Sequence, residues 1–216
     1  MSKFRMSSNK ENLTANLFVF AAPSGAGKTT LVHALMAQRE KDFSFSISYT
    51  TRKPRPNELN GIDYLFIDIE KFMSLKESGE LLEHAEVFGN YYATSRSQVE
   101  EHLSNKRNVI LEIDWQGAQQ VRKSMPKCIS IFIMPPNIAE LSRRLRERRT
   151  DKPEVIERRL KNAKEDMSHW DEFDYVVINE NLKEAIIDLE SIIDGSGDAL
   201  LSSNKTLRRR LGKILK

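Results

Sequence analysis

Apolar runs of strand length alternate along this chain with segments of helical pattern. The runs that predict buried strands occupy residues 17–21, 109–114, 129–134 and 175–179. The segments that predict helices occupy residues 30–36, 115–125, 138–168 and 182–193. Strands that alternate with helices favour a parallel sheet with helices on both faces. The pattern therefore predicts an α/β fold.

The middle of the chain has a different pattern. Residues 43–49 alternate strictly between apolar and polar, which predicts a half-exposed strand with Phe43 on its covered face. Further short strands are predicted at residues 64–67 and 81–88. Short strands in a row predict a small, mostly β subdomain at about residues 45–94, inserted into the α/β core.

Capping residues predict two further helices. Asp68 precedes a segment that ends at Gly79, and Ser95 or Ser97 precedes a segment that runs to about Asn105. Short polar side chains favour helix N-termini, and glycine favours the residue after a helix.

Composition limits the class of protein. The chain has 216 residues, of which 39% are hydrophobic and 30% charged, as in globular proteins. No apolar run approaches the ~20 residues of a membrane span, so we expect no membrane partner. Residues 1–15 are polar and predict a flexible N-terminal extension. Cys128 is the single cysteine, which excludes an internal disulfide and favours a cytoplasmic location.

The positive charge is concentrated at the C-terminus. Residues 205–216 carry six Lys or Arg and no acid, and subtracting them from the net charge of +3 leaves −3 for the rest. We therefore expect a basic C-terminal tail over residues 195–216, beginning with a flexible Gly–Ser–Gly link. We expect no basic face on the core, and so no specific binding of nucleic acid.

The strongest chemical signal is a glycine-containing loop between the first strand and the first helix. It reads Ala22, Pro23, Ser24, Gly25, Ala26, Gly27, Lys28 and Thr29. Glycines allow successive backbone N–H groups to turn toward one point, and the following helix adds its positive N-terminus. Lys28 would contact the β- and γ-phosphates of a nucleoside triphosphate, and Thr29 would ligate Mg²⁺. The general motif begins with Gly where this chain has Ala22; the alternative is an ordinary Gly–Ser turn before a helix.

Two arginines flank a proline-containing turn in the middle segment. Arg52 and Arg55 lie on a loop stiffened by two prolines, near Ser48 and Tyr64. Two guanidinium groups can hold one phosphate by paired hydrogen bonds, and a tyrosine hydroxyl can add a donor. The alternative is a solvated basic loop.

Carboxylates at strand positions supply two further candidates. Glu83 could accept from the N1–H and 2-amino group of a guanine, and Thr94 could donate to its O6; the alternative is a Glu that faces water. Glu112 and Asp114 end a buried strand, at the sheet edge where α/β proteins bind ligands. They could hold a Mg²⁺-bound water or a ligand hydroxyl, whereas the alternative for Asp114 is to cap the next helix.

Arginines are dense in the segment 138–168. Arg144 and Arg148 are four residues apart, so they share one face of a helix, and Arg159 follows in the same segment. Arginines over a triphosphate stabilise the charge of the transferred phosphoryl group. A solvated basic helix is the alternative for most arginines of this segment.

Together these segments resemble the guanylate kinase family, especially its bacterial enzymes, over about residues 16–194. The motifs that carry the resemblance are residues 22–29, 50–56, Gly61 with Tyr64, Glu83, 89–92, 112–117 and 135–136. The resemblance implies a P-loop core with a parallel sheet flanked by helices, a GMP-binding insertion at about 45–94 and a helical lid at about 137–170. Glu112 stands where the family usually has Asp, and Arg149 where it often has Gly.

The resemblance also implies roles for particular residues. ATP would be bound by residues 22–29 and Asn179, with Mg²⁺ on Thr29 and, through water, on Glu112. The residues implied in GMP binding are Ser48, Arg52, Arg55, Tyr64, Glu83, Tyr92, Thr94 and Asp114. The residues implied in catalysis are Lys28, Arg52, Arg144, Arg148 and Arg159.

The implied reaction is transfer of the γ-phosphate of ATP to GMP, giving ADP and GDP, with Mg²⁺ as cofactor. Two alternatives remain: a kinase of the same class with another nucleotide acceptor, and a non-catalytic module that binds phosphopeptides with the same arginines. Lys28 and Thr29 favour an enzyme. The sequence leaves open whether the chain forms a homo-oligomer.

Overall fold

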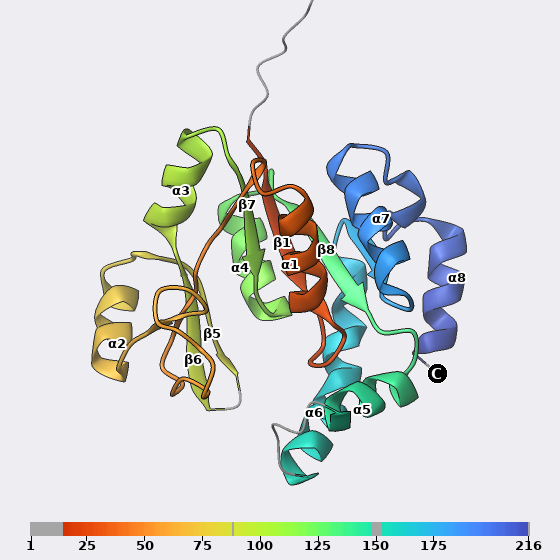
Figure 1. Ribbon diagram of the computed structural model, residues 1–216, viewed down its shortest axis with the longest axis horizontal. Helices are drawn as coiled ribbons and strands as arrows, with labels where there is room; N and C mark the ends of the chain where they lie inside the picture. The colour runs from red at the N-terminus through yellow and green to blue at the C-terminus, as the bar shows by residue number, and fades with distance from the viewer. Residues whose placement is uncertain (1–14, 88, 148–152, 216) are drawn as a thin grey trace, which may run out of the picture.

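The computed structural model describes residues 15–87, 89–147 and 153–215. Its larger sheet has five parallel strands in the order β2-β7-β1-β8-β9. These strands are β1 (Leu17–Ala21), β2 (Phe43–Phe45), β7 (Asn108–Glu112), β8 (Ile129–Met134) and β9 (Tyr175–Ile178). The sheet confirms the predicted α/β fold, and it lies in the middle of the molecule in Figure 1.

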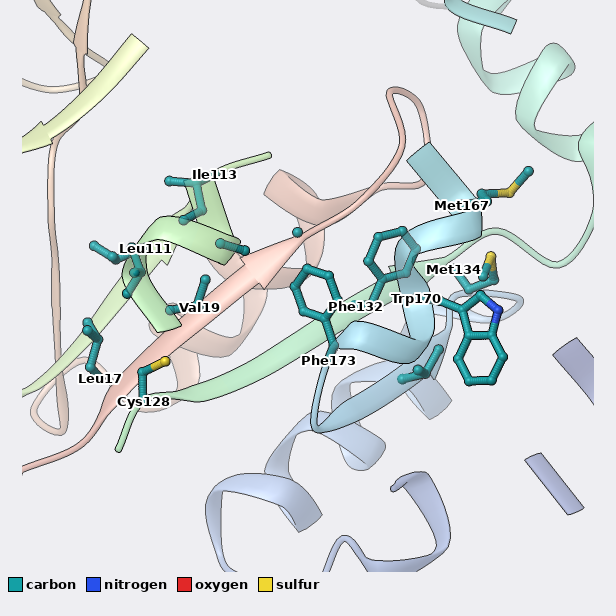
Figure 2. Close-up of a cluster of buried hydrophobic side chains, with 14 of the residues drawn as sticks. Leu17, Val19, Leu111, Ile113, Cys128, Phe132, Met134, Met167, Trp170 and Phe173 are labelled. Atoms are coloured by element: carbon teal, nitrogen blue, oxygen red, sulfur yellow. The ribbon is translucent and has the colours of Figure 1, made fainter. Parts of the chain in front are cut away.

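Helices cover both faces of this sheet because the side chains of each strand alternate. In β1, Phe18 and Phe20 pack against α1 (Lys28–Gln38) and α7 (Leu182–Ile193). Leu17 and Val19 point to the other face. That face is covered by α3 (Arg96–Ser104), α4 (Trp115–Ser124), α6 (Pro153–Ser168), the 3₁₀ turn η1 (His169–Glu172) and α8 (Lys205–Ile214). Figure 2 shows this second core, where Phe132 of β8 lies beside Phe173.

The predicted β subdomain is a separate four-stranded sheet in the order β4-β3-β6-β5. Its strands are β3 (Tyr49–Thr50), β4 (Leu65–Phe66), β5 (Leu81–Val87) and β6 (Asn90–Ser95). Helix α2 (Ile69–Glu77) packs on it through Phe72 and Leu75. The subdomain lies at one side of the core sheet in Figure 1, and β5 is the strand that contacts the core helix α4.

The predicted single strand at residues 43–49 is wrong, because the chain changes sheets there. Residues 43–45 pair with β7 in the core, whereas Tyr49 and Thr50 pair with β6 of the small sheet. Between them Ser46 is buried, and its amide donates to the Ile110 carbonyl at 3.2 Å. The alternating pattern therefore runs across the junction between the two sheets.

The arginine-rich segment contains two helices, α5 (Ile138–Glu147) and α6. They lie together at one end of the core in Figure 1. The pairing is held by a small apolar cluster that includes Leu141, Leu145 and Ile156. Residues 148–152 lie outside the described residues.

The C-terminal segment is packed on the core instead of forming a free tail. After the 3₁₀ turn η2 (Asp198–Leu200), helix α8 buries Leu207 and Leu211, which are four residues apart and so share one face. Arg208 lies over the ring of Trp170, with its guanidinium carbon 4.8 Å from the ring centre. The expectation of a tail rested on charge alone and overlooked this apolar pair.

The expected N-terminal extension lies outside the described residues except for residue 15. Within the described ranges, no helix has the length and apolar character needed to cross a membrane.

Candidate active site

The loop after β1 turns sharply and leads into α1. Gly25 and Gly27 have φ values of 91° and 92°, a left-handed conformation that glycine adopts without strain. The Ala26 amide donates to the Pro23 carbonyl at 3.1 Å and closes the turn. A Cβ at residue 27 would lie 2.4 Å from the side-chain nitrogen Nδ2 of Asn179, so this close approach also requires glycine. The loop thus presents backbone amides and a helix N-terminus to one point, which suits a phosphate.

Lys28 is the half-buried cation of this loop. Its Nζ donates to the Ile113 carbonyl at 2.7 Å, just beyond the end of β7. Burial lowers the pKa of Lys28 from its ordinary value, and the facing carboxylates of Glu112 and Asp114 offset part of that effect. The lysine is therefore anchored at the carboxyl edge of the sheet, beside the phosphate loop.

Thr29 and Glu112 form a pair of hard oxygen ligands. The Thr29 hydroxyl donates to Glu112 Oε2 at 2.8 Å. The other carboxylate oxygen, Oε1, is buried and has no hydrogen-bond partner among the described residues. A hydroxyl beside a carboxylate with a free oxygen fits a Mg²⁺ ion that keeps several of its waters.

Side chains from distant elements brace the loop. The Ala26 carbonyl accepts from Asn179 Nδ2 at 2.7 Å and from Arg144 of α5 at 3.2 Å. Arg144 also donates to the Asn179 carbonyl at 2.9 Å, and Arg159 of α6 donates to the Ser24 hydroxyl at 3.2 Å. Two of the predicted lid arginines therefore contact the phosphate loop, whereas Arg148 lies outside the described residues.

A cavity of about 520 Å³ joins the loop to the β subdomain. That volume is typical of sites for small ligands. The predicted residues that line it are Ala22, Pro23, Ser24, Gly25, Gly27, Lys28, Thr29, Ser48, Arg55, Tyr64, Glu83, Tyr92, Glu112, Asp114 and Arg159. The other predicted residues that the structure describes are not part of this lining and are Ala26, Arg52, Thr94, Arg144 and Asn179.

Glu58 organises the two arginines of the proline turn, and the sequence analysis missed it. Its carboxylate accepts from both terminal nitrogens of Arg52, at 2.9 and 2.8 Å, and from the Arg55 backbone amide at 2.7 Å. The Arg52 guanidinium also lies over the Tyr64 ring, 5.3 Å from its centre. A signal was present, because an acid three residues after Arg55 can close a turn onto it.

Glu83 is a buried carboxylate whose environment disfavours its charge. Only 3% of the residue is exposed, and the Thr94 hydroxyl donates to Oε1 at 2.6 Å. Burial raises the pKa of Glu83 to about 8, and the hydrogen bond from Thr94 offsets part of that effect. The sequence predicts that Thr94 donates to a ligand, whereas in this structure its hydroxyl donates to Glu83.

Asp114 performs the structural role that was the alternative for it. It is the N-cap of α4, and Oδ1 accepts from the Gly117 amide at 2.7 Å. Burial raises the pKa of Asp114 above its ordinary value. Because Asp114 also lines the cavity, capping the helix and facing a ligand are compatible.

Asp166 of α6 is a second carboxylate that the analysis missed. It lines the cavity and accepts from the Trp115 indole N–H at 3.3 Å. Burial raises the pKa of Asp166 to about 6. A single acid in an amphipathic helix gives no sequence signal, because it is indistinguishable from an ordinary solvent-facing residue.

Comparison with known proteins gives one consistent result. The family model for guanylate kinase matches residues 14–196. The guanylate kinase of Alkalilimnicola ehrlichii is 48% identical over 203 residues, which cover 94% of this chain and all of that protein. The guanylate kinase of Dechloromonas aromatica is 52% identical over 185 residues, covering 86% of this chain and 91% of that protein.

The fold gives the same result. The crystal structure of guanylate kinase from Anaplasma phagocytophilum is similar with a TM-score of 0.71 and 33% identity, covering 93% of this chain and 95% of that one. The family model spans most of the chain, and the phosphate loop, the inserted sheet and the cavity between them agree with it. The chain therefore belongs to the guanylate kinase family.

Proposed function

We propose that this chain transfers the γ-phosphoryl group of ATP to GMP, giving ADP and GDP. The observation that carries the proposal is the shared cavity, which is lined by the phosphate loop on one side and by Arg55, Tyr64 and Glu83 on the other. A donor nucleotide on the loop and an acceptor on the small sheet would meet there. Membership of the guanylate kinase family supports both substrates.

The donor side would hold ATP through its backbone and Lys28. The loop amides and the start of α1 would bind the phosphates, while Asn179, which braces Ala26, would lie near the adenine. Thr29 and Glu112 would hold Mg²⁺, as the free Glu112 oxygen supports. When bound, the ion supplies charge neutralisation at the phosphate oxygens.

The acceptor side would divide into a phosphate end and a base end. Arg52, Arg55, Tyr64 and Tyr92 would bind the phosphate of GMP, with Glu58 keeping the two guanidinium groups together through its hydrogen bonds with Arg52 and its ion pair with Arg55 at 3.5 Å. Ser48, Glu83 and Thr94 would recognise guanine, and Asp114 would contact the nucleotide from the core. In that arrangement Thr94 acts on the base through the Glu83 carboxylate that it holds.

Catalysis would then depend on the positions of the reacting groups and on neutralisation of the charge on the transferred phosphoryl group. The attacking group is a phosphate oxygen of GMP, which is already an anion, so no strong general base is required. Lys28 and the arginines Arg144, Arg148 and Arg159 would neutralise the charge that develops on the transferred group. Closure of α5 and α6 over the cavity would exclude water, which would otherwise hydrolyse ATP. Because the substrates are soluble metabolites, we place the enzyme in the cytoplasm.

An acceptor panel tests this proposal. ADP release is measured with GMP, AMP, CMP, UMP and dTMP, for the wild-type chain and for Glu83→Gln. We expect GMP to be preferred over AMP by about 10⁴-fold, because a site built for the N–H groups of guanine leaves its acceptors unpaired with adenine. Glu83→Gln should narrow the GMP/AMP ratio, mainly through a lower kcat/KM for GMP.

Other outcomes identify the alternatives. Preference for a different nucleotide would make the chain a kinase for that acceptor. Arginine-dependent binding of a phosphopeptide without turnover of any nucleotide would identify a non-catalytic module. If Glu83→Gln discriminates as well as the wild type, guanine is recognised by other residues, with Ser48, which lines the cavity, as the first candidate.

A further inference from the structure

Helix α4 of the core is attached to the strand that carries Glu83. The Gln120 side chain accepts from the His84 amide at 3.1 Å and donates to the His84 carbonyl at 2.7 Å. β5 is the outer strand of the small sheet, so these backbone groups point away from the rest of that sheet. Gln120 therefore pairs the open edge of β5 directly beside Glu83.

The first turn of the same helix touches the Glu83 carboxylate itself. A Cβ at residue 117 would lie 2.4 Å from Glu83 Oε2 and 3.3 Å from Asp114 Oδ1. Glycine costs about 1 kcal/mol relative to alanine inside a helix, so its presence in α4 needs a reason. The close approach of two buried carboxylates supplies it, because any side chain at position 117 would displace Glu83.

We propose that Gly117 and Gln120 are positioning residues for acceptor selectivity. Gln120 fixes the position of β5 relative to the core helix α4, and Gly117 provides the space that the Glu83 carboxylate occupies. Thr94 fixes Oε1 of that carboxylate from the opposite side. The part of the enzyme that recognises the acceptor base would then belong to the core helix α4 as much as to the β subdomain. This inference rests on the proposed recognition of guanine by Glu83.

The same helix connects the two substrates. Asp114 caps α4, and the Ile113 carbonyl one residue earlier accepts from Lys28. A shift of α4 would therefore move Glu83 and the anchor of Lys28 together. Selectivity for the base is the more specific readout, since the atom that a methyl group at position 117 would approach most closely is Glu83 Oε2, whereas Asp114 Oδ1 lies farther away at 3.3 Å.

The test compares GMP with inosine monophosphate, which differs from GMP only by lacking the 2-amino group. Their kcat/KM ratio measures the hydrogen bond to that group and does not depend on the fraction of folded protein in the sample. Gly117→Ala should lower the ratio at least tenfold, since displacement of a binding group by about 1 Å costs up to ~10²-fold. Gln120→Ala should lower it about threefold, the loss of a modest hydrogen bond. The ATP KM should change less than twofold in both.

Matched controls are available in the chain. Gly212→Ala makes the same exchange in α8, where a Cβ meets nothing within 4 Å. Gln119→Ala removes the neighbouring glutamine of α4, whose amide donates to Glu172 at 2.8 Å on the side away from β5. Both controls should keep the wild-type ratio.

Glu83→Gln distinguishes failure of the proposed guanine recognition from failure of the proposed roles of Gly117 and Gln120. If it leaves the GMP to inosine monophosphate ratio unchanged, Glu83 does not contact the 2-amino group, and this inference is overturned. If the GMP to AMP ratio is unchanged as well, Glu83 does not recognise guanine, and the proposed role of Glu83 falls with it. If Glu83→Gln collapses the GMP to inosine monophosphate ratio while Gly117→Ala and Gln120→Ala keep it within twofold of wild type, the proposed function stands and this inference is overturned. A collapse in Glu83→Gln and Gly117→Ala, with an intermediate loss in Gln120→Ala, supports it.

Discussion

The phosphate loop carries its groups within residues 22–29, whereas the opposite wall of the cavity takes Ser48, Arg55 and Glu83 from separate segments of the small sheet. The loop takes its sharp turn from its own glycines, and the side chains of Asn179, Arg144 and Arg159 brace it. The acceptor wall acquires its shape from contacts between elements, such as Glu58 with Arg52. The difference shows how one cavity can combine a locally encoded site with one that exists only in the folded protein.

The two walls also differ in charge. On the donor side the titratable group with a shifted pKa is a half-buried cation, Lys28, whose pKa desolvation lowers. On the acceptor side it is an acid, Glu83, whose pKa burial raises. The surroundings of both groups thus disfavour their charged forms. Phosphate oxygens beside Lys28, or guanine N–H donors beside Glu83, would favour the charged form of each group again. Variants on each wall should therefore affect different kinetic parameters.

The largest effect is expected on the donor side. Lys28→Ala should lower kcat by about 10²–10³-fold, because the lysine charge acts mainly as charge shifts during transfer. GMP affinity, measured by isothermal titration, should stay within twofold of wild type. Lys127→Ala, which removes an exposed lysine, serves as the control. A Lys28→Ala variant that keeps more than half of its activity would rule out the P-loop mechanism.

The next largest effect is expected at the acceptor phosphate. Arg52→Ala should raise the GMP KM about 10–100-fold, since a charge-assisted hydrogen bond contributes about 1.5–3 kcal/mol. Arg55→Ala should have the smaller effect, because its side chain is 46% exposed while that of Arg52 is 16% exposed. The ATP KM should change less than twofold in both. Equal effects on both substrates would show that the two walls are not independent.

The locally determined parts of the molecule could be predicted from the sequence. The phosphate loop was predicted from its glycines, and both have the expected positive φ. Asp68 caps α2 by accepting from the Lys71 amide at 2.7 Å, and Ser95 caps α3. The bounds of β1, β8 and α7 match the apolar patterns that predicted them. In each case the residues that predict the element lie within about ten residues of it in the sequence.

The parts that depend on distant contacts could not be predicted. Glu58 and Gln120 act on groups that the fold brings to them, and the residue type alone does not show this. The change from one sheet to the other at Ser46 gives no sequence signal, because the alternating pattern continues across it. At the C-terminus the charges of α8 concealed Leu207 and Leu211, which pack into the core. The acceptor wall, as the part built from such contacts, was the harder half of the site to predict.

A moderate effect is expected from pH. With the pKa of Glu83 raised to about 8 by burial, the carboxylate is largely protonated at pH 7 before GMP binds. Guanine offers N–H donors and requires the ionised form, so kcat/KM for GMP should rise about fivefold from pH 7 to pH 8. Glu83→Gln should remove that rise. ATP binding, measured over the same range, should not follow it.

The linkage gives a second measurement of the same group. A carboxyl whose pKa is raised in the folded protein binds its proton more tightly there than when unfolded. Its contribution to stability is therefore lost as pH rises toward 8. Since bound GMP would pair with the ionised form, the increase in Tm caused by GMP should be larger at pH 8 than at pH 7. A Tm increase that is the same at both values would contradict the assignment of guanine recognition to Glu83.

The smallest effect is expected at Glu58, which touches arginines on the acceptor wall. Glu58→Gln should raise the GMP KM by about threefold, because a neutral amide cannot accept from both terminal nitrogens of Arg52. Burial alone would raise the pKa of Glu58, but hydrogen bonds from Arg52 and the Arg55 amide lower it below its ordinary value. The effect should therefore be the same at pH 7 and pH 8, unlike that of Glu83→Gln.

Whether Glu58→Gln raises or lowers the GMP KM shows how Glu58 acts on the two arginines of the acceptor wall. A higher GMP KM, with kcat and the ATP KM unchanged, means that Glu58 holds Arg52 and Arg55 in place for the phosphate. A lower GMP KM would mean instead that the carboxylate competes with the phosphate for Arg52. Glu70→Gln, at an exposed acid of α2 in the same subdomain, is the control and should leave the GMP KM unchanged.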